Sequence, residues 1–231
     1  MCGRFVLSTP ADALAAEFSA STGGLLLRPR YNIAPMQDIV VVRSDGGERK
    51  LLTMRWGLVP SWAKDPSIAS KLLNARSETA ATRPAFRDAV RRRRCIVPAS
   101  GFYEWKKEGT RKQPWYFRPS QTSCTLAIAA LWEKWKSPEG EWIETCCLLT
   151  TGANTVLAPV HDRMPVLLDR EGVARWLDSS CTDPERIGDL LAPCDAGVIE
   201  GHAVSTAVNS VRNDDARNIE AERPAQEGLP F

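Results

Sequence analysis

Apolar and polar positions alternate along this chain in short runs, and turn-forming residues separate the runs. Two of them, residues 38–43 and 50–55, flank Ser44-Asp45-Gly46-Gly47, which is a strong β-hairpin signal. Six further strands are predicted, over residues 95–99, 102–106, 115–117, 125–133, 142–150 and 166–168. Because most connections between them are short, the pattern favours antiparallel neighbours over crossover units.

Helical signals are fewer than strand signals. Thr9 is placed to cap a helix with Pro10 at its first position, and Leu14 and Phe18, four residues apart, would form its buried stripe. Three further helices are expected, over residues 84–92, 170–177 and 184–191. This mixed order predicts an α+β fold, a single domain with a curled, mostly antiparallel, barrel-like sheet flanked by short helices. We expect the domain to cover residues 1–212 and a polar tail to cover residues 213–231.

The composition indicates a globular protein of the cell interior. Of 231 residues, 43% are hydrophobic and the net charge is +2. No apolar run approaches the roughly 18 residues that cross a membrane, and the start lacks the basic-then-apolar layout of a secretory signal. Seven cysteines without regular spacing fit a reducing compartment. We therefore expect a cytoplasmic protein without membrane contact, associated with the nucleoid if bacterial.

The basic residues are unevenly distributed. Seven arginines fall between Arg76 and Arg94, and local basicity of this kind can serve phosphate binding. For the run at residues 91–94 alone, a solvated helix end is the favoured interpretation. The adjacent Cys146 and Cys147 cannot form a Cys-x-x-Cys knuckle, and with only two histidines in the chain no metal site is expected.

Cys2 follows the initiator methionine directly. Removal of Met1 would give one residue both a free α-amine and a thiol. The amine, with a pKa of about 8, condenses with an aldehyde to an imine, and the thiol, with a pKa of about 8.5, closes onto the imine as a five-membered thiazolidine. An internal cysteine cannot do this chemistry, but many chains carry a cysteine at position two by chance.

Two stretches place polar residues where a packed core does not need them. Asn74 and Arg76 would share one side of an extended segment, where an amide and a planar guanidinium fork suit phosphate oxygens; a helix cap is the alternative. Glu104 lies between aromatic residues in Phe102-Tyr103-Glu104-Trp105. Apolar surroundings raise a carboxyl pKa toward the range useful for proton transfer, whereas an edge strand would leave Glu104 in solvent.

A third group combines proton transfer with base stacking. His161 lies in a turn that ends at Pro165, and imidazole transfers protons near neutral pH; a histidine satisfied by local backbone is the alternative. Thr150 ends a strand and could contact a substrate or cap the next turn. The stretch from residue 55 to residue 62 contains Arg55 beside Trp56, and it ends in Trp62; a tryptophan beside an arginine can form a platform on which unpaired bases stack.

Six motifs stand in order along the chain: Met1-Cys2-Gly3-Arg4-Phe5, Tyr31-Asn32-Ile33-Ala34-Pro35, Arg55-Trp56-Gly57-Leu58-Val59-Pro60, Asn74-Ala75-Arg76-Ser77-Glu78-Thr79, Gly101-Phe102-Tyr103-Glu104-Trp105 and His161-Asp162-Arg163-Met164-Pro165. Together they resemble the SRAP family, the SOS-response-associated peptidases, whose members protect abasic sites in single-stranded DNA by covalent attachment. The resemblance runs from Cys2 to about Val211.

The resemblance implies that Met1 is removed, in an autoproteolytic or aminopeptidase-assisted step, and that Cys2 then forms a thiazolidine with the abasic-site aldehyde. It implies further roles for the residues that match the motifs: Asn74 holds the modified cysteine, Glu104 is the acid and base, and His161 is its proton-handling partner. Arg4 and Arg76 match residues that grip flanking phosphates. Thr150 falls at the position of an active-site hydroxyl, and Pro35, Trp56 and Trp62 match parts of a nucleic-acid channel.

The expected partner is therefore single-stranded DNA that contains abasic sites, bound by a monomer without metal or organic cofactor. Some bacterial relatives carry two adjacent tryptophans where this chain has Trp62-Ala63, which leaves the number of stacked bases open. Two alternatives remain. Glutamine amidotransferases, which are N-terminal-nucleophile amidohydrolases, also begin Met-Cys-Gly, and a single-strand binding module would need no chemistry.

Overall fold

The structure is a computed structural model, and it describes residues 2–121 and 124–222 of the chain. In these residues the strands are β1 (Phe5–Leu7), β2 (Ala20–Ser21), β3 (Arg30–Ile33), β4 (Asp38–Asp45), β5 (Glu48–Trp56), β6 (Asn74–Arg76), β7 (Arg94–Ala99), β8 (Gly101–Glu108), β9 (Arg111–Pro119), β10 (Leu126–Lys136), β11 (Trp142–Gly152), β12 (Arg163–Pro165), β13 (Leu167–Leu168) and β14 (Ile199–Ala203). The α-helices are α1 (Ala11–Phe18), α2 (Ser77–Ala80), α3 (Arg87–Arg92) and α4 (Arg170–Leu177). The 3₁₀ helices are η1 (Pro66–Lys71), η2 (Pro184–Leu191), η3 (Ala196–Val198), η4 (Thr206–Asn209) and η5 (Ala216–Ile219).

The larger sheet closes on itself as a barrel. Strands β11, β10, β7, β4 and β5 pair antiparallel in that order, and β5 then pairs in parallel with β11, where Trp56 lies opposite Cys146. The hairpin of β4 and β5 turns through Gly46 and Gly47, whose φ angles of 61° and 93° suit the two-residue turn that matches strand twist. The expected α+β fold with a curled, mostly antiparallel sheet is confirmed.

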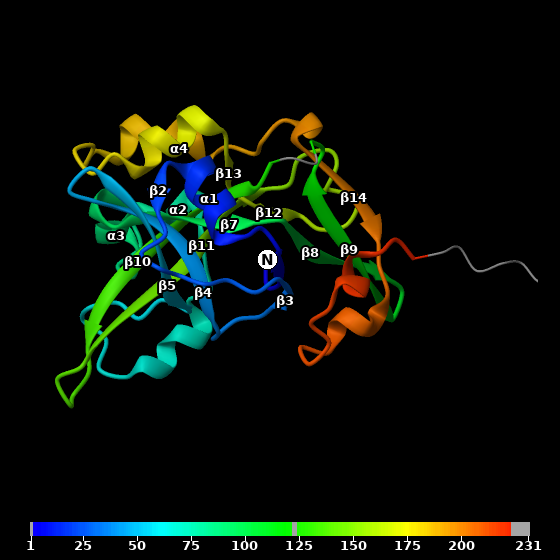
Figure 1. Cartoon of the computed structure of the whole chain (residues 1–231), viewed down its shortest axis with the longest axis horizontal. Coiled ribbons are helices and arrows are strands. Elements are labelled where there is room, and N and C mark those ends of the chain that lie inside the picture. Colours follow the sequence, from blue (N-terminus) through cyan, green and yellow to red (C-terminus); the bar gives the residue numbers. More distant parts are fainter. Residues whose placement is uncertain (1, 122–123, 223–231) are drawn as a thin grey trace, which may run out of the picture.

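A second sheet lies beside the barrel and carries the start of the chain. Its strands follow the order β14-β9-β8-β1-β3. In Figure 1 the barrel strands β4, β5 and β10 lie on one side, β8, β9 and β14 lie on the other, and the beginning of the chain, drawn in blue, lies between them. In β1, Phe5 pairs with Phe102, and the carbonyl of Arg4 accepts from the Tyr103 backbone N–H at 2.9 Å.

The core joins the two sheets at the start of the chain. Cys2, Phe5 and Trp56 are all fully buried in one cluster, and the rings of Phe5 and Trp56 meet edge to face with centroids 5.4 Å apart. Burying aromatic rings of this size supplies much of the stabilisation of such a core. The packing fixes Cys2 and Phe5 against the barrel.

Several local expectations need correction. Thr9 does not cap α1, because the cap is Pro10 and no side chain bonds there; Leu14 and Phe18 are buried as expected. The helix expected from residue 84 begins at Arg87, and residues 184–191 form a 3₁₀ helix whose cap is the Asp183 side chain. In residues 213–222 the expected polar tail lies against the fold, because η5 packs there and Glu222 donates its backbone N–H to the Ala203 carbonyl. The rest of the expected tail lies outside the described residues.

The prediction that the arginine run at residues 91–94 forms a solvated helix end is wrong for Arg94. Its side chain is buried and all five of its N–H groups meet backbone carbonyls, which belong to Val90, Arg91, Trp176, Asp178 and Cys181 at 2.6–2.9 Å. These carbonyls lie near the carboxyl ends of α3 and α4, where a cation also suits the helix dipole. Arg94 therefore ties two helix ends to the barrel, whereas Arg91 and Arg92 are exposed.

Replacing Arg94 by methionine is expected to lower the free energy of unfolding by roughly 2–5 kcal/mol, because buried carbonyls lose their donors. The measurement is chemical denaturation. Arg91→Met is the matched control, and a change at an exposed site of this kind stays within about 0.5 kcal/mol. Equal losses in the two variants would contradict the role assigned to Arg94.

Candidate active site

Cys2 is held in place by a side chain from the barrel. The Asn74 amide Nδ2 donates to the Cys2 carbonyl oxygen at 3.0 Å. Asn74 begins β6, a strand that pairs in parallel with β11 and so has a fixed register. The alternative of Asn74 as a helix cap is wrong, because α2 begins after Arg76 and no side chain caps it.

Glu104 is buried, and its strand is an interior one. β8 pairs with β1 on one side and β9 on the other, and Glu104 is only 2% exposed. The alternative of a solvent-facing edge position is therefore wrong. Burial raises the pKa of the Glu104 carboxyl above its ordinary value near 4.5, and the nearby His161 opposes the rise without cancelling it.

His161 faces Glu104 across the site. Its Nε2 lies 4.0 Å from Glu104 Oε2, while its Nδ1 accepts from the Arg163 backbone N–H at 2.9 Å. The same Nδ1 lies 3.0 Å from Asp162 Oδ1 and 3.3 Å from the Arg163 carbonyl oxygen, so these contacts hold the ring with its Nε2 toward the Glu104 carboxyl. The local-backbone alternative is thus correct for one ring nitrogen, and that bond orients the other nitrogen.

The Cys2 thiol shares this environment. Burial, and then the negative charge of Glu104, raise the pKa of the Cys2 thiol far above its ordinary value. In this arrangement the sulfur is a protonated thiol, and it becomes a nucleophile only when a base takes its proton. Because the charge of Glu104 affects the pKa of the Cys2 thiol, the protonation states of these two groups are coupled.

A cavity of about 490 Å³ lies beside both Glu104 and His161. Its lining residues are Arg4, Glu104, Trp105, Lys112, His161 and Asn209. The Trp105 indole donates to Asn209 Oδ1 at 2.8 Å, and the Arg4 guanidinium carbon lies 5.8 Å from the Trp105 ring centroid. Sequence reasoning missed Lys112 and Asn209 as lining residues, because each lies on a different element and neither stands in a motif with a chemical pattern.

Arg76 and Thr150 lie opposite each other where β6 pairs with β11, but only Arg76 is exposed. Thr150 is fully buried and its hydroxyl donates to the Ala75 carbonyl at 3.5 Å. The prediction that Thr150 contacts DNA is corrected on this ground, since its side chain is enclosed between strands. Arg163, which also orients His161, donates to the Thr150 carbonyl at 2.6 Å and pairs with Glu78.

The two tryptophans of the expected stacking platform differ in exposure. Trp56 is fully buried and its indole donates to the Leu73 carbonyl at 2.9 Å, so the prediction that it contacts DNA is corrected. Trp62 is 57% exposed and lines a separate cavity of about 450 Å³ with Ala63, Lys64 and Lys71 among its neighbours. Pro35 is half-buried in the turn before β4 and lines neither of these cavities.

Within the described part of the chain, no group of three or more His, Cys, Asp or Glu side chains is arranged to hold a metal ion. In the same residues, no helix is long and apolar enough to cross a membrane.

This geometry defines an α+β protein that encloses the cysteine of its second position beside a buried carboxyl and an imidazole. The model of the SOS response associated peptidase (SRAP) family matches residues 1–211, and the chain belongs to that family. It is 41% identical over 226 residues to the abasic site processing protein YoqW of Bacillus subtilis, with 96% of this chain and 100% of that protein covered.

The chain is also similar to a vertebrate protein in sequence and to a bacterial protein in structure. The abasic site processing protein HMCES of Gallus gallus is 35% identical over 218 residues, which cover 81% of this chain and 64% of that protein. The crystal structure of a protein from Bacteroides thetaiotaomicron superposes with a TM-score of 0.87 at 25% identity, over 96% of this chain and all of that one.

Proposed function

We propose that this protein processes abasic sites in single-stranded DNA by forming a covalent thiazolidine through Cys2 after Met1 has been removed. The observation that carries the proposal is the placement of Cys2, clamped by Asn74 and electrostatically coupled to Glu104, which lines a cavity together with His161. Relatives named abasic site processing proteins support it, among them one that is 41% identical over 96% of this chain.

The chemistry requires a free amine on Cys2. Hydrolysis of the Met1–Cys2 peptide bond comes first and releases methionine. The amine then adds to the aldehyde carbon of the ring-opened deoxyribose, and loss of water gives an imine. The thiol adds across the carbon–nitrogen double bond, the nitrogen gains the proton that the sulfur loses, and a five-membered ring closes. The ring is longer-lived than the imine, because an imine hydrolyses readily.

The neighbouring groups have roles that follow from their positions. Glu104, with its pKa raised by burial, is a stronger base than an ordinary carboxylate, and it both takes and returns a proton in the reaction. His161, whose Nε2 is turned toward Glu104, serves the sugar oxygen during ring opening. Asn74 holds the Cys2 carbonyl and so orients the amine and the thiol together.

DNA is bound mainly through its backbone. The half-buried Arg4 and the exposed Arg76 supply positive charge for phosphates, and the exposed Trp62 ring offers a face for a neighbouring base. Because Cys2 is fully buried, an abasic sugar must leave the base stack to reach it. We therefore expect a preference for single strands over duplexes, with little dependence on sequence.

The test is incubation of the purified protein with a single-stranded oligonucleotide that carries one abasic site, followed by a denaturing gel. Mass spectrometry first confirms that Met1 is absent. A heat-stable band of protein joined to DNA supports the proposal, and an oligonucleotide without the abasic site is the control. No band from processed protein would contradict it; DNA binding without a band indicates a binding module, and glutamine hydrolysis indicates an amidohydrolase.

A further inference from the structure

Arg4 lies in the wall of the cavity and is held by neutral oxygens. Its Nη1 donates to Asn32 Oδ1 at 2.7 Å and to the Val208 carbonyl at 2.9 Å. Among the described residues, no carboxylate forms an ion pair with Arg4. The guanidinium is therefore fixed on one side while its positive charge stays available to an anion in the cavity.

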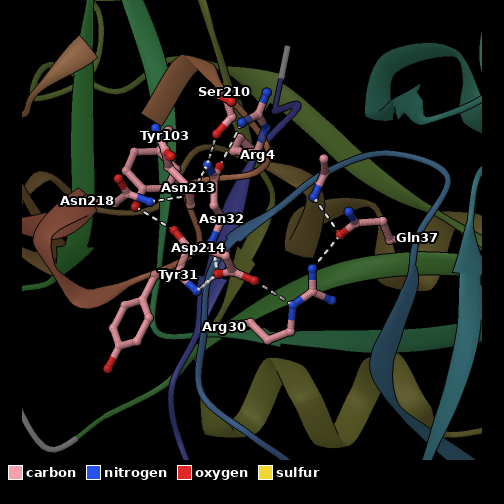
Figure 2. A network of polar contacts seen from close by, with 11 residues as sticks. Arg4, Arg30, Tyr31, Asn32, Gln37, Tyr103, Ser210, Asn213, Asp214 and Asn218 are labelled. Atoms are coloured by element: carbon pink, nitrogen blue, oxygen red, sulfur yellow. Dashed lines mark hydrogen bonds and ion pairs between the residues drawn. The ribbon is translucent and has the colours of Figure 1, made fainter. Parts of the chain in front are cut away.

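Asn32 is the side chain that connects Arg4 to the C-terminal part of the fold. It is fully buried, and its amide Nδ2 lies within hydrogen-bond distance of three carbonyls, those of Val208, Ser210 and Asn213, at 3.1, 3.0 and 2.7 Å. Its oxygen faces Arg4 and its nitrogen faces the turn of residues 208–213. Figure 2 shows this side chain between the two groups. An amide fits because it accepts at one end and donates at the other.

Asp214 anchors the same turn from the other side. Its Oδ1 accepts the backbone N–H groups of Tyr31 and Asn32 at 2.5 and 2.8 Å, and its Oδ2 meets Arg30 Nε at 3.0 Å. Figure 2 shows these contacts joining β3 to the segment that follows η4. Asp214 lies beyond residue 211, where the match to the family model ends. The turn that supplies the Val208 carbonyl is thus tied at both of its ends to β3.

We propose that Asn32 is a positioning residue that holds the Arg4 guanidinium at the cavity wall in the orientation that binds a DNA phosphate. The turn of residues 208–213, which Asp214 anchors to β3, supports Asn32 in this position. The proposal rests on the function given above, because it takes the ligand of Arg4 to be the backbone of single-stranded DNA. Arg4 acts on the ligand, and Asn32 acts only through Arg4.

The alternatives to asparagine at position 32 show why both ends of the amide are needed. Alanine leaves the Arg4 Nη1 with one acceptor fewer and leaves the three carbonyls without their donor. Aspartate would pair with Arg4 and cancel its charge, and it would set a carboxylate against carbonyl oxygens. Leucine has a similar size but no polar atom, and buried polar groups without partners are costly.

The experiment is a double-mutant cycle on the affinity for an undamaged single-stranded oligonucleotide, measured at several salt concentrations with processed protein. Arg4→Ala is expected to weaken binding on the order of tenfold and to lower the salt slope by about 0.7. Asn32→Ala is expected to do nearly the same, and the double variant should be no weaker than either single variant. Additive effects would overturn the proposal.

A matched control separates positioning from general loosening. Asn218 is also buried and donates to the Asn213 carbonyl at 2.6 Å, but it does not contact Arg4. Asn218→Ala is expected to destabilise the same segment and to leave the salt slope at the wild-type value; an equal fall in slope would overturn the role of Asn32. If Asn32→Ala does not fold, Asn32→Ser replaces it in the cycle, because its hydroxyl retains a donor.

A second readout does not depend on DNA. Exchange of the Arg4 side-chain N–H protons with water, followed by NMR, is expected to quicken in the Asn32 variant and to stay slow in Asn218→Ala; unchanged exchange would overturn the proposal. A wild-type protein that binds single strands but forms no covalent band would sink the proposed function while this inference stands. A protein that binds no DNA at all would sink both.

Discussion

Replacing Cys2 by serine is expected to abolish the heat-stable crosslink to abasic DNA, a fall on the order of 10²-fold or more. Once mass spectrometry shows that the variant has lost Met1, serine still carries the α-amine and the imine still forms, but a hydroxyl is a weaker nucleophile than a thiol and gives no lasting ring. Borohydride, which reduces an imine to a stable amine, should therefore trap Cys2→Ser on abasic DNA. The measurement is a denaturing gel of both proteins with and without the reductant.

Two controls define this result. Cys124 is exposed, so Cys124→Ser removes a more accessible thiol and should leave the crosslink at the wild-type level. A chain with a residue added between Met1 and Cys2 keeps the thiol but moves the amine away from it, and we expect no stable band from it. A heat-stable band from Cys2→Ser without reductant, at the wild-type yield, would refute the thiazolidine.

The fold was predictable where its signals are local. The hairpin of β4 and β5 could be found because Gly46-Gly47 lies between two alternating runs, and α4 because its apolar residues recur at helical spacing. Barrel closure could not be found. Closure depends on the parallel pairing of Trp56 with Cys146. These two residues lie far apart in the sequence, and no local pattern around either of them indicates the other as its partner. Three-residue strands such as β6 and β12 are too short to show a period.

The site divides in the same way. The aromatic residues that flank Glu104 made a buried acid one of two interpretations, beside an exposed edge position, and the structure buries it. The role of Asn32 could not be read from its motif, because its polar partners come from a turn that follows it by more than 170 residues. For Trp56 the sequence predicted a role that the structure does not support. An aromatic residue beside an arginine has the same pattern whether its ring is exposed for stacking or buried in the core, and the Trp56 ring is buried.

Glu104→Gln is expected to slow crosslink formation by about 10²–10⁴-fold, the usual contribution of a positioned acid and base. Glutamine has nearly the same shape and fills the same buried place, but it cannot take or return a proton. Binding of undamaged single strands, which depends on arginines, should change little. The measurement is the rate of band formation at saturating protein, with the affinity for undamaged DNA as the control.

Glu104→Gln is also expected to be more stable than the wild type at neutral pH, because it removes a carboxyl that is costly to ionise in its buried place. Burial raises the pKa of Glu104 in the native protein above its ordinary value near 4.5. Between the ordinary pKa and the raised native pKa, the native state holds a proton that the unfolded chain has released. The free energy of unfolding therefore falls as the pH rises through this interval. Below the ordinary pKa the carboxyl is protonated in both states, and the stability advantage of the glutamine variant should disappear. Denaturation of both proteins at pH 4 and pH 7 measures this, and a variant that loses stability at pH 7 along with its rate would mark Glu104 as a structural residue.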